Sequence, residues 1–459
     1  MTLFDAYGRE VKTEFLKGEQ AAPTMAGVRN IYSVTHPSVA LSPDKLFAIL
    51  TQAEFGDPFE YLELAEDMEE KDLHYVGVLG TRKETCAQLD LVVKPASQSA
   101  GDVRAADMVR AQLKSPALLL TDALFDVLDA IGKGFSVVEI LWDTAGPEWF
   151  PQAMKWRDPR WFMFDWISGQ EVLVRTLRDE QGLDKLYPSA TDADDEAFHF
   201  KKSPWGSVMT GRQPLTAPLA PFKFITHQAR TKSGLPIRGG LARASAWSWL
   251  FKNCILKDWL GFCETYGQPF RVGKYQTGAS EHDKEKLLEA VRRIGPDAAA
   301  IMPESMMIEF VQAREAKGEV FREMSAYLDA QVSIAVLGQT LTTDLPHGGG
   351  GSRAAAQVHQ LVRRDILASD ARRVAGTLLR DLVKPIVDLN LGPQAVYPSI
   401  ELGLPDDVDE KVFAEICAML ADRGLEIDQR MVRDRLGMSE PSAGGKVLHA
   451  LAGKGEPVP

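Results

Sequence analysis

Two stretches of the sequence bring together residue types that could support chemistry. Between Gln339 and Arg353 the chain reads QTLTTDLPHGGGGSR, so four consecutive glycines follow a group of threonines. Such a loop can cradle phosphate groups with its backbone, act as a hinge, or form a changing contact with a passing ligand. Between 189 and 199 the chain reads SATDADDEAFH, an acidic turn of the kind that can bind a divalent cation.

Neither stretch matches a known catalytic motif. A phosphate-binding G-x-x-x-x-G-K-[ST] loop follows a strand and contains a lysine, whereas this glycine run follows a helical pattern and contains none. The acidic turn lacks the glycine and the final glutamate of a calcium loop, so a solvated loop is the alternative interpretation. Motifs of the G-x-S-x-G and H-E-x-x-H types are also missing from the sequence. We therefore expect no catalytic residues, no metal and no cofactor.

Composition and charge narrow the class of protein. The 459 residues exceed one ordinary core, so we expect two or more subdomains. The formal charge of −12 argues against a protein that grips nucleic acid tightly, but not against one that lets it slide past. No apolar run reaches the length of a membrane helix, and acidic residues follow the N-terminus where a secretion signal would be apolar. We therefore expect a cytosolic chain without membrane contact.

The cysteines do not form a recognisable framework. Cys86, Cys254, Cys263 and Cys417 are scattered, and none of them belongs to a C-x-x-C pair. This spacing indicates neither a disulfide framework nor a zinc site. We expect all four to be small buried hydrophobic residues.

The first half of the chain mixes helical and strand patterns. Ser42 followed by Pro43 is typical of a helix start, LDLVVKP (89–95) predicts a strand, and residues 103–130 form an amphipathic helical region. GKGFSVVEILWD (132–143) predicts a strand that is rich in β-branched residues. The five tryptophans between 142 and 166 allow two interpretations, a base-stacking platform or a β-meander that packs its aromatic side chains into a core.

Two helical segments enclose a small insert. The first begins after Gly240 and ends at Gly267. It carries one apolar stripe at steps of four, formed by Trp247, Phe251, Ile255, Trp259 and Cys263. The insert is predicted to be a strand in FRVGKY, a helix capped by Ser280, and a strand in MMIEFVQ (306–312). The chain then returns in a second helix, whose predicted stripe is Met324, Leu328, Val332 and Val336.

A long helix follows the glycine run. Helix-forming residues extend from Ser352 to about Lys384, where Pro385 should kink or end the helix. Some thirty residues would make a rod of roughly 50 Å. Val358, Val362 and Ile366 mark one stripe, and Val374, Leu378 and Leu382 mark a second beyond Asp370. We expect that such a rod cannot be buried within one chain and needs neighbouring subunits. A closing strand in PQAVYPSIEL (393–402) and a short helical pair complete the sequence.

The order of these parts resembles the portal proteins of tailed bacteriophages, specifically the portal family of Mu-like phages and prophages. The resemblance spans residues 30–400 and rests on the number and order of several phrases, none of which is a chemical motif by itself. The phrases are DLHYVGVLGTRKETCAQLDLVVKP, GKGFSVVEILW, DPRWFMFD, SGLPIRGGLARASAWSWLFKN, ETYGQPFRVGKY, DAAAIMPESMMIEFVQA and LGQTLTTDLPHGGGGSRAAAQVHQLVRRDIL.

The resemblance implies an α+β portal fold with wing, stem, clip and crown, in which long helices line the central channel of a ring, usually of twelve subunits. The ring would stand at one capsid vertex of the virion, after assembly in the host cytoplasm. The implied regions are the N-terminal arm and wing (1–235), the two stem helices (236–266 and 318–338), the clip (267–317), the tunnel loop (339–353), the long wing helix with the closing strand (354–405), and the crown with the C-terminal tail (406–459).

The resemblance also implies partners. Double-stranded DNA would slide through the ring without sequence specificity during packaging and ejection. The terminase large subunit and the head–tail adaptor would dock on the clip, and the ring would nucleate assembly with the major capsid protein or scaffold. The tunnel-loop residues facing DNA would be Gln339, Thr340, Thr342, Thr343, His347, Gly348, Gly349, Gly350, Gly351, Ser352 and Arg353. The clip residues facing terminase or adaptor would be Lys274, Tyr275, His282, Lys284, Lys286, Arg292 and Arg293.

Three alternatives remain open from the sequence. The glycine run can be a connector with no role toward DNA. Arg353 can pair with an acidic residue of a neighbouring subunit and not with phosphate. The chain can also be a cytosolic metal-dependent nuclease or hydrolase that uses Asp192, Asp194, Asp195 and Glu196.

Overall fold

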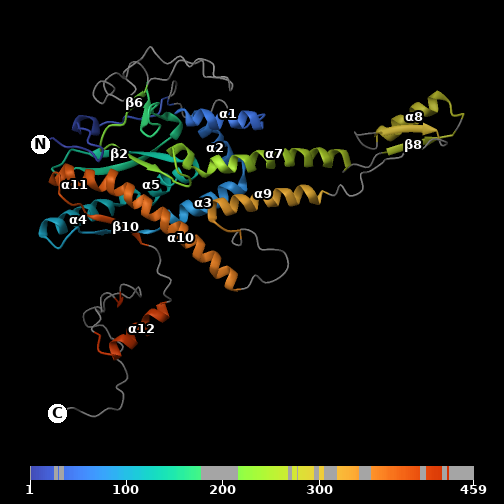
Figure 1. Ribbon diagram of the computed structural model, residues 1–459. Coiled ribbons are helices and arrows are strands. Elements are labelled where there is room, and N and C mark those ends of the chain that lie inside the picture. The colour runs from blue at the N-terminus through green and yellow to red at the C-terminus, as the bar shows by residue number, and fades with distance from the viewer. Residues whose placement is uncertain are drawn as a thin grey trace, which may run out of the picture. The chain divides into compact units, whose positions relative to one another are not determined.

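The computed structural model describes residues 2–24, 29, 36–176, 216–266, 271–276, 278–293, 299–303, 318–340, 353–403, 410–425 and 432–433. The chain mixes helices and strands and separates into two compact units, Met1–Leu402 and Gly403–Pro459 (Figure 1). The second unit contains α12 (Glu410–Asp422). Within the described ranges, no helix combines the length and apolar character that crossing a membrane requires.

A three-stranded antiparallel sheet forms the centre of the first unit. Its middle strand is β2 (Phe135–Asp143), flanked by β3 (Phe150–Arg157) and β7 (Phe224–Gln228). The residues of β2 are almost all buried, as expected for a β-branched strand with neighbours on both sides. The strand prediction for residues 132–143 is therefore confirmed.

Two smaller sheets complete the strands of this unit's body. One is antiparallel and contains β4 (Phe162–Phe164), β5 (Val172–Arg175) and β6 (Thr216–Pro218). In the other, β1 (Asp90–Lys94) pairs with β10 (Ser399–Gly403), which confirms both predicted strands and joins segments far apart in the sequence. A T-shaped contact between Phe135 and Phe164, with ring centroids 4.9 Å apart, links the first two sheets.

The tryptophan-rich stretch packs into these sheets. Trp142 and Trp161 are each only 5% exposed, and Trp142 Nε1 donates a hydrogen bond of 2.8 Å to the carbonyl of Phe222. Trp156, on β3, is 37% exposed and lies beside the ammonium of Lys133. Buried rings that are committed to core contacts cannot stack on bases, so the core interpretation is confirmed for Trp142 and Trp161, whereas Trp149 and Trp166 are half-buried.

Short helices surround the sheets. Ser42 caps the first helix through a hydrogen bond from the backbone N–H of Lys45, with Pro43 at the first helical position, as predicted. The predicted helical region 103–130 is interrupted at Pro116, and Leu119 there adopts a left-handed φ of 45°. The helices are α1 (Pro43–Glu54), α2 (Phe59–Lys71), α3 (Leu73–Ala87), α4 (Ala100–Leu113), α5 (Leu120–Val127) and α6 (Ala130–Lys133), with 3-10 turns at Thr13–Leu16, Pro116–Leu118, Pro159–Trp161 and Pro236–Gly239.

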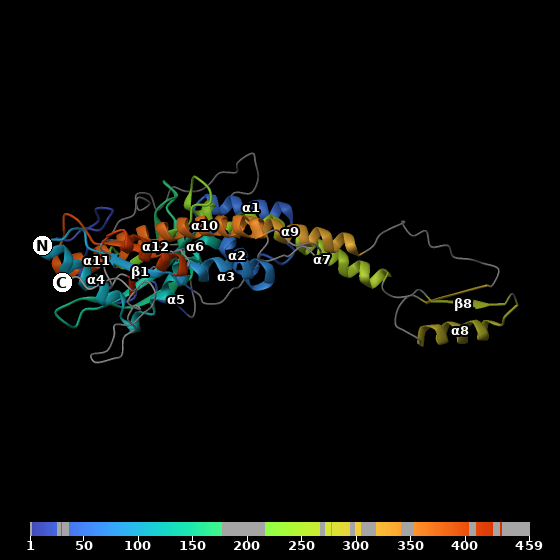
Figure 2. The same cartoon turned by 90° about the horizontal axis from the view of Figure 1, so that it is seen from below.

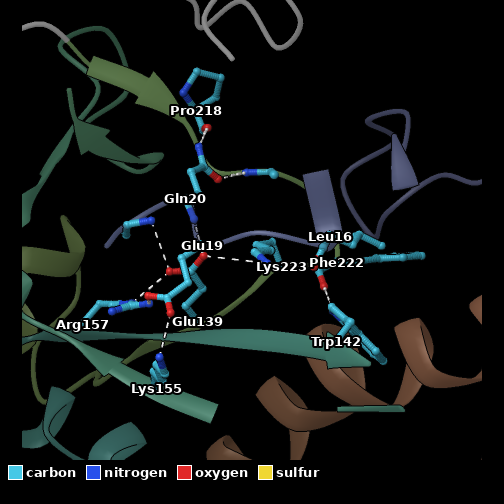
Figure 3. Close-up of polar contacts among 12 residues, drawn as sticks. Leu16, Glu19, Gln20, Glu139, Trp142, Lys155, Arg157, Pro218, Phe222 and Lys223 are labelled. Carbon is cyan, nitrogen blue, oxygen red and sulfur yellow. Dashed lines mark hydrogen bonds and ion pairs between the residues drawn. The ribbon is translucent and has the colours of Figure 1, made fainter. Parts of the chain in front are cut away.

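A buried carboxylate ties the N-terminal segment to the central sheet (Figure 3). Glu139, on β2, is fully buried and accepts hydrogen bonds from the backbone N–H groups of Gln20 at 2.5 Å and Ala21 at 3.1 Å. The guanidinium of Arg157 donates to the same carboxylate at 2.9 Å, and the ammonium of Lys223 lies 3.8 Å from it. Because a buried charge is tolerated only with such partners, this cluster fixes the path of the N-terminal segment.

Two long helices run antiparallel from the body of the first unit. They are α7 (Leu241–Tyr266) and α9 (Glu319–Leu337), yellow-green and orange in Figures 1 and 2, where they lie side by side in both views. Both agree with the predicted helical segments. The insert between them contains β8 (Arg271–Tyr275), α8 (Glu281–Arg293) and β9 (Ala299–Pro303).

The insert differs from its prediction in one strand. Ser280 caps α8 by accepting a hydrogen bond of 3.3 Å from the backbone N–H of Asp283, as expected. The strand that pairs with β8 is β9, however, and it runs parallel to β8. The predicted strand 306–312 lies outside the described residues. Short alanine-rich strands such as β9 carry little sequence signal, because alanine is depleted in strands.

The long helix after the glycine run continues through its proline. The segments α10 (Arg353–Leu378) and α11 (Lys384–Leu391) are joined by a π-helical turn, Leu379–Val383, in which the N–H of Lys384 donates to the carbonyl of Leu379. This wider turn directly precedes Pro385, whose ring has no N–H and would clash with a carbonyl one α-turn earlier. The expected end or kink at Pro385 is thus a π-turn, and the helix runs on to Leu391.

The cysteine prediction is only partly correct. Cys86 is buried, and burial raises the pKa of its thiol to about 12. Cys254 and Cys263 on α7 are exposed, and Cys417 on α12 is intermediate. All four are free thiols, but two of them are not core residues because they lie on faces of α7 that no other part of the described chain covers.

Candidate functional site

The contact between α7 and α9 combines stacked aromatic rings with a shared lysine. The rings of Trp259 and Phe321 stack with an interplanar angle of 9° and centroids 6.4 Å apart, and Phe262 also contacts Phe321. Lys252 donates to Asp329 on α9 at 2.6 Å and to Asp72, the cap of α3, at 3.0 Å. These carboxylates raise the pKa of Lys252 despite its partial burial. The lysine thus fixes both long helices to the body of the unit.

The predicted stripe on α7 does not coincide with the face that α9 covers. Of its members Ile255 is buried, but Phe251 is 48% exposed and Cys263 is exposed as well. Each step of four residues overshoots one helical turn by about 40°, so five such positions spread over roughly 160° of the helix surface. The face that contacts α9 shares Trp259 with the predicted stripe and adds Lys252 and Phe262, at steps of seven and three.

Large apolar side chains remain exposed on this helix pair. On α9 they share one face by helical spacing, at positions 320, 324, 327 and 334. On α7 two of them lie one turn apart. The exposed fractions are 52% for Val320, 51% for Met324, 63% for Tyr327, 47% for Ile334, 38% for Leu256 and 67% for Leu260. The predicted α9 stripe is therefore divided, because Val332 and Val336 are buried within the chain whereas Met324 faces outward.

The described structure reaches both ends of the glycine-rich segment. Gly338 closes α9 with a left-handed φ of 72°, Gln339 is only 2% exposed, and Thr340 is half-buried. Arg353 is the first residue of α10. The other predicted tunnel-loop residues, Thr342, Thr343, His347, Gly348 to Gly351 and Ser352, lie outside the described residues. Gln339 is thus less exposed than Thr340, the next of the predicted tunnel-loop residues.

The predicted clip residues lie on β8 and α8. Lys274, His282 and Lys286 are exposed, whereas Tyr275 and Lys284 are half-buried. Lys284 pairs with Glu281 at 2.7 Å, which raises the pKa of the lysine, and its ammonium lies 5.1 Å from the ring centroid of Tyr275. Arg292 and Arg293 are the last two residues of α8. The insert therefore presents several cations on one short helix and the adjacent strand.

The acidic cluster Asp192, Asp194, Asp195 and Glu196 lies outside the described residues. Among the residues that are described, no group of three or more His, Cys, Asp or Glu side chains is arranged to hold a metal ion. Sequence reasoning missed Lys252 and Arg82, the residues that join the long helices to α3. Neither residue carried a distinctive signal, because Arg82 is followed directly by Lys83 and Glu84, and Lys252 is one of several charged residues on its helix.

The chain is similar to known proteins over most of its length. The family model described as "Portal protein of Mu bacteriophage" matches residues 62–438. The Mu-like prophage FluMu protein gp29 of Haemophilus influenzae is 33% identical over 440 residues, covering 95% of this chain and 77% of that protein. The portal protein of Escherichia phage Mu is 32% identical over 415 residues, covering 88% of this chain and 72% of that protein.

These matches define a phage structural protein. More narrowly, the chain belongs to the portal protein family of Mu-like bacteriophages. This confirms the resemblance read from the sequence, and with it a virion protein that is structural and not enzymatic. The nuclease alternative is therefore not retained. A solved gene transfer agent virion contains a chain with 12% identity and a TM-score of 0.45, covering 89% of this chain and 99% of that one, a likeness too distant to support conclusions.

Proposed function

We propose that about twelve copies of this protein form a ring at one capsid vertex, through which DNA is packaged and later ejected. Membership of the Mu portal family supports this proposal. The structural observation that carries it is the exposed apolar face of α9, formed by Val320, Met324, Tyr327 and Ile334. Complete burial of one such side chain contributes roughly 1.5–3 kcal/mol. Four of them at a subunit contact would therefore supply several kcal/mol to ring assembly.

The regions of the proposed portal follow the elements of the chain. The arm and wing comprise residues 1–235, and the long wing helix with the closing strand comprises 354–405. The α7–α9 pair supports an assignment of 236–266 and 318–338 as stem helices, because two antiparallel helices that enclose one insert must project it from a common base. The clip is then 267–317, and the crown with the C-terminal tail is 406–459, close to the unit boundary at Leu402.

DNA would contact residues 339–353, the tunnel loop of this proposal. Threonine, histidine and serine side chains offer hydrogen bonds to phosphates without a strong positive charge, which suits a DNA helix that must slide. Backbone freedom at Gly348–Gly351 would let each subunit meet a different part of the DNA helix. The chain's net charge of −12 agrees with weak contact. Arg353 would provide a phosphate contact at the loop base or pair with a neighbouring subunit.

The insert would face the partners outside the capsid. The cations of β8 and α8 are suited to acidic surfaces, and we assign them to the terminase large subunit during packaging and to the head–tail adaptor afterwards. The ring would contact the major capsid protein or scaffold during assembly. Assembly would take place in the host cytoplasm.

Electron microscopy of the purified protein and its molar mass in solution test the ring. We expect annular particles with an axial hole from the natural chain. A double variant, Met324→Glu with Tyr327→Glu, should yield folded monomers because it places charges at the proposed contact. Phe47→Glu is the matched control, since Phe47 on α1 is 65% exposed, close to the 63% of Tyr327. Folded, monodisperse monomers of the natural chain at micromolar concentration would overturn the proposal.

The DNA role of the loop has a separate test. Shortening Gly348–Gly351 should leave ring formation unchanged and reduce the DNA packaged or retained by particles assembled with the variant. The amount of DNA per particle measures this effect. Particles that package and hold DNA normally without these glycines would favour the connector interpretation.

A further inference from the structure

One arginine of α3 holds two helix segments on either side of the glycine-rich segment. Arg82 Nη1 donates a hydrogen bond of 2.7 Å to the carbonyl of Val336, in the last turn of α9. Its Nε and Nη2 donate to the carboxylate of Asp370, on α10, at 2.7 Å and 3.0 Å. The two side chains are only 11% and 6% exposed. Because a guanidinium has several donors in one rigid plane, a single residue can tie both helices to α3.

Contacts between α9 and α10 reinforce this junction. A Cβ on Gly338 would lie 2.8 Å from side-chain carbons of both Val362 and Ile366, so any other residue here would force these side chains of α10 to move. Its positive φ of 72° adds strain for any other residue. Nearby, Arg363 Nη2 donates to Thr85 Oγ1 on α3 at 2.9 Å. The chain thus leaves the junction at Gly338 and returns to it at Val362.

We propose that Arg82 is a positioning residue, which fixes the last turn of α9 and the middle of α10 at one point on α3. This inference rests on the proposed function, since these two helices flank the loop assigned there to DNA. With both helices held on α3, a displacement that begins before Val362 does not propagate into α9 or into the second half of α10. The ring can then keep its shape while the loops respond individually to DNA.

Hydrogen exchange in the assembled full-length protein tests the anchoring directly. Arg82→Met should raise amide hydrogen exchange in the last turn of α9 and in α10 near Asp370 by roughly tenfold. Both segments lose the hydrogen bonds that hold them to α3. Lys83→Met is the matched control on the same helix. Lys83 is also a buried cation, 7% exposed, but it pairs with Asp129 at 2.9 Å, on α3's other side. The Lys83→Met variant should therefore leave exchange in the last turn of α9 and in α10 near Asp370 unchanged.

The DNA content of assembled particles separates positioning from a general structural role. Rings should form from the Arg82→Met variant as from the natural chain, while DNA per particle falls toward the level of the variant with a shortened glycine run. Arg82→Lys keeps the charge but has no planar fork, so it should give an intermediate value. If Arg82→Met fails to fold, the double variant Arg82→Met with Asp370→Leu, which removes both buried charges, is used in the same tests.

The inference would be overturned if the Arg82→Met variant and the natural chain showed the same exchange rates in the last turn of α9 and in α10 near Asp370. Normal DNA content in that variant, when shortening Gly348–Gly351 lowers it, would also overturn the inference, because the loop would then work without its anchor. If shortening the glycines itself changes nothing, the proposed DNA role of the loop is wrong. In that case exchange alone decides whether Arg82 fixes the helix ends.

Discussion

Two helix faces carry similar apolar stripes but differ in what covers them: one runs from the second half of α10 into the π-turn, and the other is the outer face of α9. Val374, Leu378 and Leu382 are at most 1% exposed and pack within their own chain. Met324 and Tyr327 on α9 are more than half exposed. A stripe shows that a helix face needs a partner, but it does not say whether that partner belongs to the same chain. Our expectation that the whole long helix needs neighbouring subunits was therefore wrong for its second half.

The largest expected effect contrasts the two halves of α10. Leu378→Ala should lower the free energy of unfolding by roughly 2–5 kcal/mol, because it leaves a cavity at a residue that is 1% exposed. Leu361→Ala, on the same helix at a residue 57% exposed, should change it by less than about 0.5 kcal/mol. Urea unfolding of both variants measures the difference. Equal losses would mean that the first half of α10 is also covered within the chain.

A second contrast lies within the cluster of Figure 3. Glu139→Gln should destabilise the fold by about 3 kcal/mol, because Lys223 and Arg157 then lose the charge of a fully buried carboxylate. Glu19 contacts the same Arg157 but its side chain is 30% exposed, so Glu19→Gln should cost less than about 1 kcal/mol. Thermal unfolding of the two variants, with limited proteolysis of the N-terminal segment, compares them. A small effect at Glu139 would show that this segment is held by other contacts.

A third prediction concerns pH and the surface on which α10 rests. His227 on β7 lies with its Nδ1 2.9 Å from Thr377 Oγ1, and burial lowers its pKa from 6.5 to about 4. The unfolded chain therefore takes up this proton first as the pH falls. The stability that neutral His227 provides is complete above about pH 6.5 and is lost toward pH 4, by about 2 kcal/mol between pH 7 and pH 5.

Urea unfolding at these two pH values checks the third prediction. His227→Gln cannot take up the proton, so its stability should fall less over the same interval. Parallel losses in the variant and the natural chain would assign the pH dependence to other groups.

The smallest expected effect on unfolding is on the exposed side of α7. Leu260→Ser should change the unfolding free energy of the dissociated chain by less than about 0.5 kcal/mol, because Leu260 is 67% exposed. The same change should weaken the proposed ring, which light scattering over a dilution series measures. A marked loss of stability in the dissociated chain would indicate that α7 is covered on that side without neighbours.

Local signals predicted much of the fold. The cap at Ser42, the β-branched strand β2, and helices α7, α9 and α10 each depend on residues that are adjacent or one turn apart. Pairings between distant segments carry no such signal. The contact of β1 with β10, and the parallel pairing of β8 with β9, depend on the packing of the whole unit.

The candidate site divides in the same way. The family resemblance and the glycine run were readable from the sequence, because both consist of residue identities in order. The roles of Lys252 and Arg82 were not, since a cation on an amphipathic helix usually faces solvent. These roles depend on hydrogen bonds to Asp329, Asp370 and the Val336 carbonyl, groups at least 77 residues away in the chain. The burial of Gln339 was equally unreadable, because a polar residue after a helix end usually faces solvent.

The two exposed thiols of α7 are natural sites for chemical labelling. Cys254 and Cys263 are accessible to maleimide dyes, whereas Cys86 is buried and its raised pKa keeps it unreactive near neutrality. Nine residues along a helix amount to a rise of about 13 Å and half a turn, so the two sulfurs report on opposite sides of α7. Labelling kinetics of the natural chain, without any introduced residue, can therefore reveal which side of this helix becomes shielded when copies associate.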